Sequence, residues 1–157
     1  MKNIIIIVLV LIIASLAGWG FYKGYRIKTN AKEIKALIEQ SNSKWTYDGV
    51  ISKDYSTKSE METELKKVYE DSKEQLVKLN TLKSTSKTHA LEQKTQNYFS
   101  TAILVADETQ EILDSDNYLD VISTSPLVGE KEEIILKTYP DQIKQESAAL
   151  TKTVFSF

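Results

Sequence analysis

Hydrophobic residues are concentrated in one unbroken run near the start of the chain. Residues 4–22 read IIIIVLVLIIASLAGWGFY and contain no charged side chain in 19 positions. As a helix with a rise of ~1.5 Å per residue, this run would be ~28 Å long. The hydrocarbon core of a bilayer is ~30 Å thick. The pattern therefore predicts an N-terminal transmembrane anchor over residues 1–25.

The end of this run carries residue types that usually lie at a membrane surface. Aromatic rings prefer the interface between lipid and water, and long basic side chains can extend from a helix toward the headgroups. We expect the membrane interface to consist of Trp19, Tyr22, Lys23, Tyr25, Arg26 and Lys28.

A cleaved signal peptide is the alternative interpretation of the same run. Ser15, Leu16 and Ala17 form a small-x-small pattern, and cleavage after Ala17 would release a secreted helical domain. The run continues past Ala17 to aromatic and basic residues that a discarded peptide would not need. This continuation favours an uncleaved anchor.

Two rules give opposite orientations for the anchor. The basic residues after the run favour a cytoplasmic domain by the positive-inside rule. An N-terminal apolar helix preceded by Lys2 resembles a signal sequence, which usually sends the following domain outward. We favour a single-pass protein of the cell membrane with its domain on the extracytoplasmic side.

After the run, apolar positions follow the spacing of a helix that continues from the anchor. They recur every three or four residues: Ile27, Ala31, Ile34, Leu37 and Ile38. No proline interrupts them, so we expect the first helix to reach about residue 40. Residues 41–56 are polar and irregular, with Asp48-Gly49 as a turn signal. We expect a loop there, although a short extended piece is the alternative.

Two further amphipathic helices are predicted over residues 58–115. Overlapping capping boxes, Thr57-x-x-Glu60 and Ser59-x-x-Glu62, indicate the start of a helix that reaches about Leu82. Residues 84–88 are a short polar connection in which Ser86 or Thr88 caps the next helix. A connection this short predicts an antiparallel helical hairpin. We expect its two helices to share a core that includes Leu76, Leu79, Ala102 and Val105.

A last helix is predicted over residues 126–154. Ser125-Pro126 is typical of an N-cap followed by proline in the first turn, and Pro140 predicts a kink near residue 140. The residues expected to face inward are Ile134, Ile135, Tyr139, Ile143, Leu150 and Val154. The fold class is therefore all-α: a transmembrane helix followed by an antiparallel three- to four-helix bundle over residues 26–157.

The distribution of charge along the chain limits the possible partners. No acidic residue precedes Glu33, whereas 15 lysines and all 22 acidic residues follow from there, so the predicted bundle is acidic. Such a domain would repel nucleic-acid phosphates, and we expect no nucleic-acid partner.

Few residues suggest chemistry. The chain has no cysteine and a single histidine, His89, and it lacks the motif of a nucleophilic serine. Gly18 and Gly20 lie inside the apolar run and therefore form no phosphate-binding loop. We expect no catalytic residues, no cofactor and no enzymatic activity.

An acidic stretch is the one candidate for an ion site. Asp114-Ser115-Asp116-Asn117 resembles the start of a calcium-binding loop, but Leu119 stands where such loops need glycine and Ser125 where they need glutamate. We interpret the stretch as a solvated face and expect no specific metal site. Its members are Asp107, Glu108, Glu111, Asp114, Asp116 and Asp120.

Three aromatic residues in the expected loop, Trp45, Tyr47 and Tyr55, have two interpretations. Exposed rings would form a surface for a protein partner. Alternatively, the rings cover the open end of the bundle.

The function that these patterns favour is a membrane-anchored, non-enzymatic helical interaction or scaffold module. Its partners would be the lipid bilayer and another membrane or envelope protein, or a second copy of the chain. A ligand- or ion-sensing bundle is the alternative. A filled core would favour the first hypothesis, and a cavity with buried polar groups the second.

Overall fold

The computed structural model describes residues 2–53, 55–115 and 129–153, and the side chains of residues 9–53, 55–115 and 129–152. Within these ranges the chain is all helical, as predicted, and has no strand. The helices, in chain order, are α1 (Lys2–Lys44), α2 (Tyr47–Ile51), α3 (Lys58–Thr81), α4 (His89–Leu113) and α6 (Glu130–Thr153).

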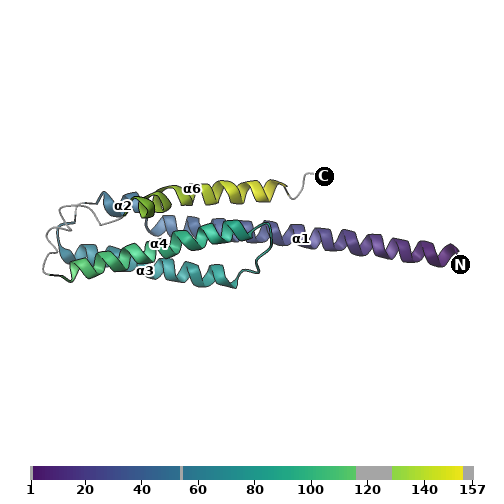
Figure 1. The fold of residues 1–157 in the computed structure, drawn as a ribbon, viewed down its shortest axis with the longest axis horizontal. Coiled ribbons are helices and arrows are strands. Elements are labelled where there is room, and N and C mark those ends of the chain that lie inside the picture. The colour runs from purple at the N-terminus through teal and green to yellow at the C-terminus, as the bar shows by residue number, and fades with distance from the viewer. Residues whose placement is uncertain (1, 54, 116–128, 154–157) are drawn as a thin grey trace.

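The four long helices lie side by side, and α1 extends far beyond the other three (Figure 1). The antiparallel hairpin of α3 and α4 makes the most extensive helix contact, and α6 packs against α1 and α4. The α3–α4 connection and the C-terminal end of α6 lie at the end of the bundle from which α1 emerges. The short helix α2 lies toward the opposite end.

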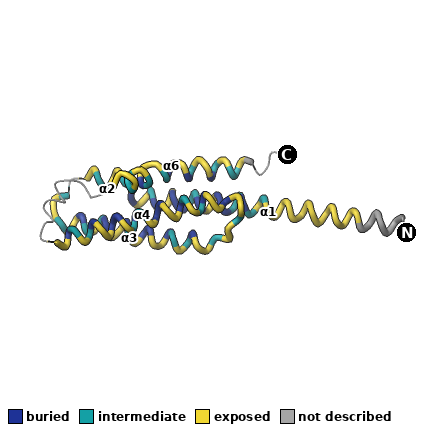
Figure 2. Tube along the Cα trace, in the orientation of Figure 1, coloured by how far each residue is buried: buried dark blue, intermediate teal, exposed yellow. Residues whose placement is uncertain are grey.

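Helix α1 is one continuous helix of 43 residues with two kinds of surroundings. Its described side chains from Leu9 to Tyr25 are almost all exposed, whereas from Ile27 onward one face is buried (Figure 2). The helix ends at Lys44, a turn later than the sequence predicted, because residues 41–44 contain no helix-breaking residue. Within the part of the chain that the structure describes, no helix has both the length and the apolar character that a membrane crossing requires.

The capping residues of α3 match the sequence signal. Thr57 is the N-cap, and its hydroxyl accepts a hydrogen bond from the Glu60 amide at 3.3 Å. The Glu60 carboxylate accepts in turn from the Ser56 amide at 3.0 Å, one residue before the position of an ideal capping box. The first of the two overlapping capping boxes therefore starts the helix.

The hairpin core matches the prediction at most positions. Leu79, Ala102 and Val105 are buried, and Leu76 is half-buried at its edge. The two aromatic residues Tyr98 and Phe99 are buried beside them with their rings edge to face at 5.0 Å. One cluster joins these residues to the inner faces of α1 and α6 through Ile34, Ile38, Leu136 and Ile143.

Helix α6 corrects the predicted inward face. Ile134 is exposed, Ile135 is half-buried, and the buried residue of this turn is Leu136, which the prediction left out. Helix α6 runs through Pro140, whose ring is buried. The predicted kink stays a prediction. The predicted cap Ser125-Pro126 and the inward Val154 lie outside the described residues.

Residues 41–56 also differ from the prediction of a loop. Residues 41–44 belong to α1, and residues 47–51 form the short helix α2. A helix of five residues is unstable alone, because few hydrogen bonds offset the ordering of its backbone. Its formation therefore depends on the bundle surface beneath it.

Candidate functional site

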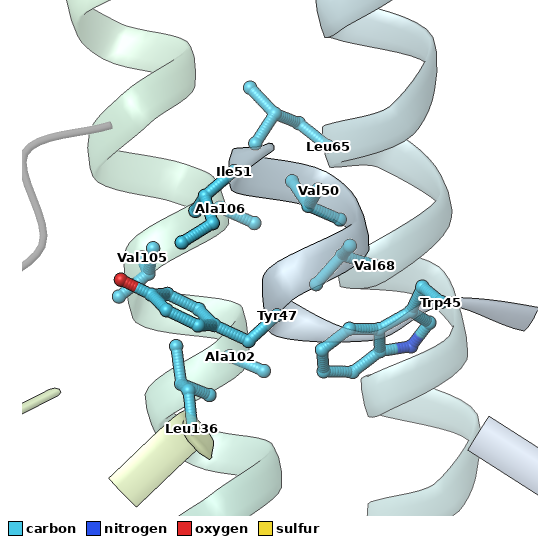
Figure 3. Close-up of a pocket in the computed structure, with 10 residues that line it drawn as sticks. All are labelled: Trp45, Tyr47, Val50, Ile51, Leu65, Val68, Ala102, Val105, Ala106 and Leu136. Atoms are coloured by element: carbon cyan, nitrogen blue, oxygen red, sulfur yellow. The ribbon is translucent and has the colours of Figure 1, made fainter. Parts of the chain in front are cut away.

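The end of the bundle near α2 holds the aromatic residues that the sequence singled out. Thr46 starts α2 by accepting a hydrogen bond from the Gly49 amide at 3.0 Å. A β-carbon on residue 49 would lie 2.8 Å from the Thr46 hydroxyl, so a larger residue there would displace this side chain. The turn places the side chains of Tyr47, Val50 and Ile51 against residues of the long helices (Figure 3).

A small apolar cavity lies beneath α2. Its volume is about 30 Å³, and its walls include Leu65 and Val68 of α3, Ala102 and Val105 of α4, and Leu136 of α6. A water molecule needs roughly 10–15 Å³ of such space, so the cavity has room for about two water molecules. An organic ligand would need the walls to move apart. A space this small and apolar fits a packed core rather than a preformed ligand site.

The three aromatic residues attach this end of the chain to the bundle. Trp45 is only 5% exposed and stacks on Tyr98 with the ring centroids 5.8 Å apart. Tyr47 is half-buried, with the Lys137 ammonium 5.6 Å from its ring. Tyr55 is half-buried and donates its hydroxyl hydrogen to the Val50 carbonyl at 2.8 Å. Trp45 is therefore buried rather than exposed, whereas the possible partner surface at Tyr47 and Tyr55 stays a prediction.

A buried carboxylate that the sequence analysis missed lies between α1 and α3. Asp71 is 4% exposed and accepts four hydrogen bonds. Its Oδ2 atom accepts from the Ser41 hydroxyl at 2.6 Å and from the Trp45 indole nitrogen at 3.0 Å. Its Oδ1 atom accepts from the Lys44 ammonium at 2.5 Å and from the Gln75 amide at 3.1 Å.

The charge of Asp71 follows from these contacts. Burial alone would raise the pKa of this carboxyl, but the hydrogen bonds from Lys44, Ser41, Gln75 and Trp45 outweigh burial and lower it. The pKa of Lys44 is raised, chiefly by its hydrogen bond to Asp71. Asp71 is therefore ionised at neutral pH, and it joins the last turn of the bundled part of α1 to the middle of α3.

This carboxylate has the contacts of a structural residue rather than of a reacting group. Both of its oxygens are occupied by donors from the protein, and it does not line the cavity under α2. Tyr98, the buried tyrosine stacked on Trp45, has its pKa raised by burial and by the charge of Asp71, so it keeps its proton. Ser72, Gln75 and Ser147 each have a buried side-chain oxygen without a partner, and none of the three lines the cavity.

The predicted membrane-interface residues lie where α1 leaves the bundle. Trp19, Tyr22 and Tyr25 are 60%, 56% and 68% exposed. The Lys23 ammonium lies 3.5 Å from the centroid of the Trp19 ring, and the Arg26 guanidinium lies 5.8 Å from that of Tyr22. Lys28, the sixth residue of this set, is half-buried.

The acidic residues and the histidine are dispersed on the surface. Asp107, Glu108 and Glu111 are exposed on α4, and His89 is exposed in the first turn of that helix. Asp116 and Asp120 lie outside the described residues. Within the described ranges, no three acidic, histidine or cysteine side chains come together in a group that could hold a metal ion.

Comparison of the chain with protein-family models, with curated proteins and with solved structures finds no significant match.

Proposed function

We propose that this protein is a membrane-anchored, non-enzymatic helical module that binds another membrane or envelope protein or a second copy of itself. One observation carries the proposal. A single continuous helix, α1, has an exposed apolar N-terminal part and a C-terminal part that is built into the bundle.

The exposed part of α1 supports the proposal of a lipid partner. Its large apolar side chains point in all directions around the helix, which is typical of a helix covered on every side. Their exposed fractions are 52% for Leu9, 59% for Val10, 62% for Leu11, 51% for Ile12, 61% for Ile13 and 64% for Leu16. At ~25 cal/mol per Å² of apolar surface, leaving such a helix in water is strongly unfavourable.

The length of the proposed anchor comes from the sequence. The uncharged run begins at Ile4, and its residues before Leu9 lie outside the described side chains. The 19-residue run matches a bilayer core of ~30 Å. The aromatic and basic residues around Tyr22 would then lie in the headgroup layer. A single span with the bundle on the extracytoplasmic side is the arrangement that we propose.

The bundle supports an interaction or scaffold role over ligand sensing. The cavity under α2 has an apolar lining and room for about two water molecules. The buried carboxylate Asp71 has its hydrogen-bonding capacity taken up by protein donors. Ligand or ion sensing remains the second hypothesis, and the acidic face of α4 is the surface that it would use.

Membrane extraction tests the anchor. After alkaline carbonate treatment of membranes from cells that express the chain, we expect it in the pellet with an intact mass that includes residues 1–17. A soluble product that begins at Gly18 would show that the run is a cleaved signal peptide. Recovery of the full-length chain in the supernatant would overturn the anchor itself.

Site-specific crosslinking tests the interaction. A photoreactive residue placed at the exposed positions Val77 of α3 or Leu104 of α4 should capture one membrane or envelope protein, or a second copy. The control position is the buried Phe99, which should capture only residues of its own chain. Absence of any protein adduct from several exposed positions in native membranes would favour the sensing hypothesis.

A further inference from the structure

Three segments that are far apart in the sequence meet at one end of the bundle, and none of them contains an acidic residue. Their described parts are residues 2–32, 75–91 and 147–153. The described parts of all three lie at the end from which α1 emerges (Figure 1). Exposed basic side chains are present in each described segment: Lys23 and Lys32 in the first, Lys83 and Lys87 in the second, and Lys152 in the third.

The opposite end of the bundle is acidic. Helix α2 carries Asp48, the last turn of α4 carries Glu111 and is followed by Asp114, and α6 begins with Glu130. The charges are therefore separated along the long axis of the molecule, with the positive end on the side of the exposed apolar helix.

Two hydrogen bonds join the α3–α4 connection to α1. The Arg26 guanidinium donates to the Lys83 carbonyl at 3.0 Å, and the Asn30 amide donates to the same oxygen at 2.7 Å. Thr85 and Thr88 close the connection with hydrogen bonds between their hydroxyl and backbone groups. The connection is therefore held at the level of residues 26–30 of α1.

With the N-terminal part of α1 inserted as proposed, this level would correspond to the surface of the bilayer. Arg26 and Asn30 follow Tyr22, the last residue of the apolar run, by four and eight residues, which is ~6 and ~12 Å along a helix. A headgroup layer is roughly 5–8 Å thick, and the Debye length in physiological salt is ~8 Å. A lysine at this level lies within or next to the headgroups.

We propose that Lys83 and Lys87 of the α3–α4 connection bind the headgroups of anionic phospholipids in the same membrane that holds α1. This proposal rests on the proposed function, because it needs the N-terminal part of α1 to be inserted. This contact is a second attachment to the membrane, on a different part of the bundle from α1. It keeps the long axis of the bundle perpendicular to the membrane surface. Repulsion between the lipid and the acidic far end acts in the same direction.

Single-site fluorescence in vesicles tests the proposal with the full chain. The chain has no cysteine, so Ser84→Cys introduces one labelling site between the two lysines. The labelled protein is reconstituted into phosphatidylcholine vesicles and into vesicles with 30% phosphatidylglycerol. Both preparations contain a lipid with a quencher on its headgroup. We expect stronger quenching with the anionic lipid, and less of it in high salt.

The double substitution Lys83→Gln and Lys87→Gln should remove this effect. A basic residue near an anionic surface contributes roughly a fivefold preference for the bound state, so the pair should lower the contact equilibrium by roughly 30-fold. The control replaces two exposed lysines of α3 that lie farther from the connection, Lys66→Gln with Lys73→Gln. It should leave the quenching unchanged. A label on Glu111→Cys at the acidic end should show no quenching.

Two results overturn the proposal in distinguishable ways. If the protein floats with the vesicles but the label at position 84 is quenched equally in both lipids, or equally in the double variant, the connection does not bind anionic headgroups. If the protein floats with neither kind of vesicle, the membrane anchor fails, and the second attachment fails with it.

Discussion

The two parts of α1 have the same backbone conformation and opposite surroundings. From Leu9 to Tyr22 the side chains are exposed and uncharged around the whole helix, whereas from Ile27 to Lys44 one face is buried and the other carries charges. Helix α1 continues through this change of surroundings because no proline interrupts it, although Gly18, Gly20 and Gly24 lie within it. The surroundings that each part can tolerate depend on how its apolar residues are distributed around the axis.

Serine hydroxyls in the two parts of α1 also have different hydrogen-bond acceptors. In the N-terminal part the Ser15 hydroxyl donates to the Leu11 carbonyl of its own helix at 2.7 Å. In the bundled part the Ser41 hydroxyl donates to Asp71 on α3 at 2.6 Å. A hydroxyl satisfied within its own helix suits an apolar solvent, whereas a bond between helices fixes how those helices pack.

The largest effect is expected from charging the N-terminal part. The double substitution Ile12→Lys with Leu16→Lys places two ammonium groups near the middle of the proposed span. On insertion scales, lysine is ~3–4 kcal/mol less favourable than leucine or isoleucine at a helix centre. We expect the protein to move from the carbonate-resistant membrane pellet to the supernatant.

The matched control is Ile12→Val with Leu16→Val, which should stay in the membrane. If the lysine variant also remains in the pellet, α1 is not held by lipid. Thermal unfolding of the bundle should be the same in both variants, because neither residue contacts the bundle core.

A pair of alanine substitutions compares the two parts directly. Ile38 is completely buried, so Ile38→Ala should reduce the free energy of unfolding by about 2–5 kcal/mol. Leu16 is 64% exposed, and Leu16→Ala should leave the unfolding of the bundle unchanged. Urea titration of the full chain in detergent micelles, followed by circular dichroism, measures both. Equal losses would show that α1 unfolds as one unit with the bundle.

Removal of the buried carboxylate should have a somewhat smaller effect. Asp71→Ala leaves Ser41 and the Trp45 indole without an acceptor in the α1–α3 interface, and an unpaired buried donor costs about 1–3 kcal/mol. We expect the free energy of unfolding to fall by about 2–3 kcal/mol, with a change in the fluorescence of Trp45. A loss as small as that of exposed Glu70→Ala would contradict a structural role for the Asp71 contacts.

The charge of Asp71 predicts the direction of an acid effect. The pKa of Asp71 is lowered in the folded protein, against ~3.9 for an unfolded aspartate. The stabilisation that the ionised Asp71 carboxylate contributes is therefore complete above pH ~4. It is lost as the pH falls through the lowered pKa of Asp71 in the folded protein. Asp71→Asn should flatten the acid side of the stability profile, and the effect is smaller than that of Asp71→Ala because part of the hydrogen bonding remains. An unchanged profile would show that other carboxylates control acid unfolding.

The smallest effect is expected where the two parts of α1 meet. Asn30→Ala removes one hydrogen bond to the Lys83 carbonyl, and the net contribution of such a bond is ~0.5–1.5 kcal/mol. We expect a loss in this range in urea titration, together with faster amide hydrogen exchange in residues 82–88. Thr29→Ala, at the half-buried neighbouring position, is the control. Unchanged exchange would show that Arg26 alone holds the connection.

Several elements could be predicted from local signals along the chain. The absence of breaking residues predicted one long first helix, and the capping box at Thr57 predicted the start of α3. The short polar connection predicted the antiparallel hairpin, with Leu79 and Ala102 in its core. These signals act within a few residues along the chain, so they can be recognised without the rest of the fold.

Packing between the helices set which apolar and polar residues are buried in α2 and α6 and around Asp71. Ile134, Ile135 and Leu136 are consecutive apolar residues that spread over more than half of a helix circumference, so packing against α1 and α4 selected Leu136 for the core. Asp71 follows Glu70 in a charged stretch that is typical of a surface, and two of its donors lie 30 and 26 residues away. The five residues of α2 become helical on the surface that they cover. In each case the free energy that selects the buried residues comes from contacts between groups that are close together only in the folded chain.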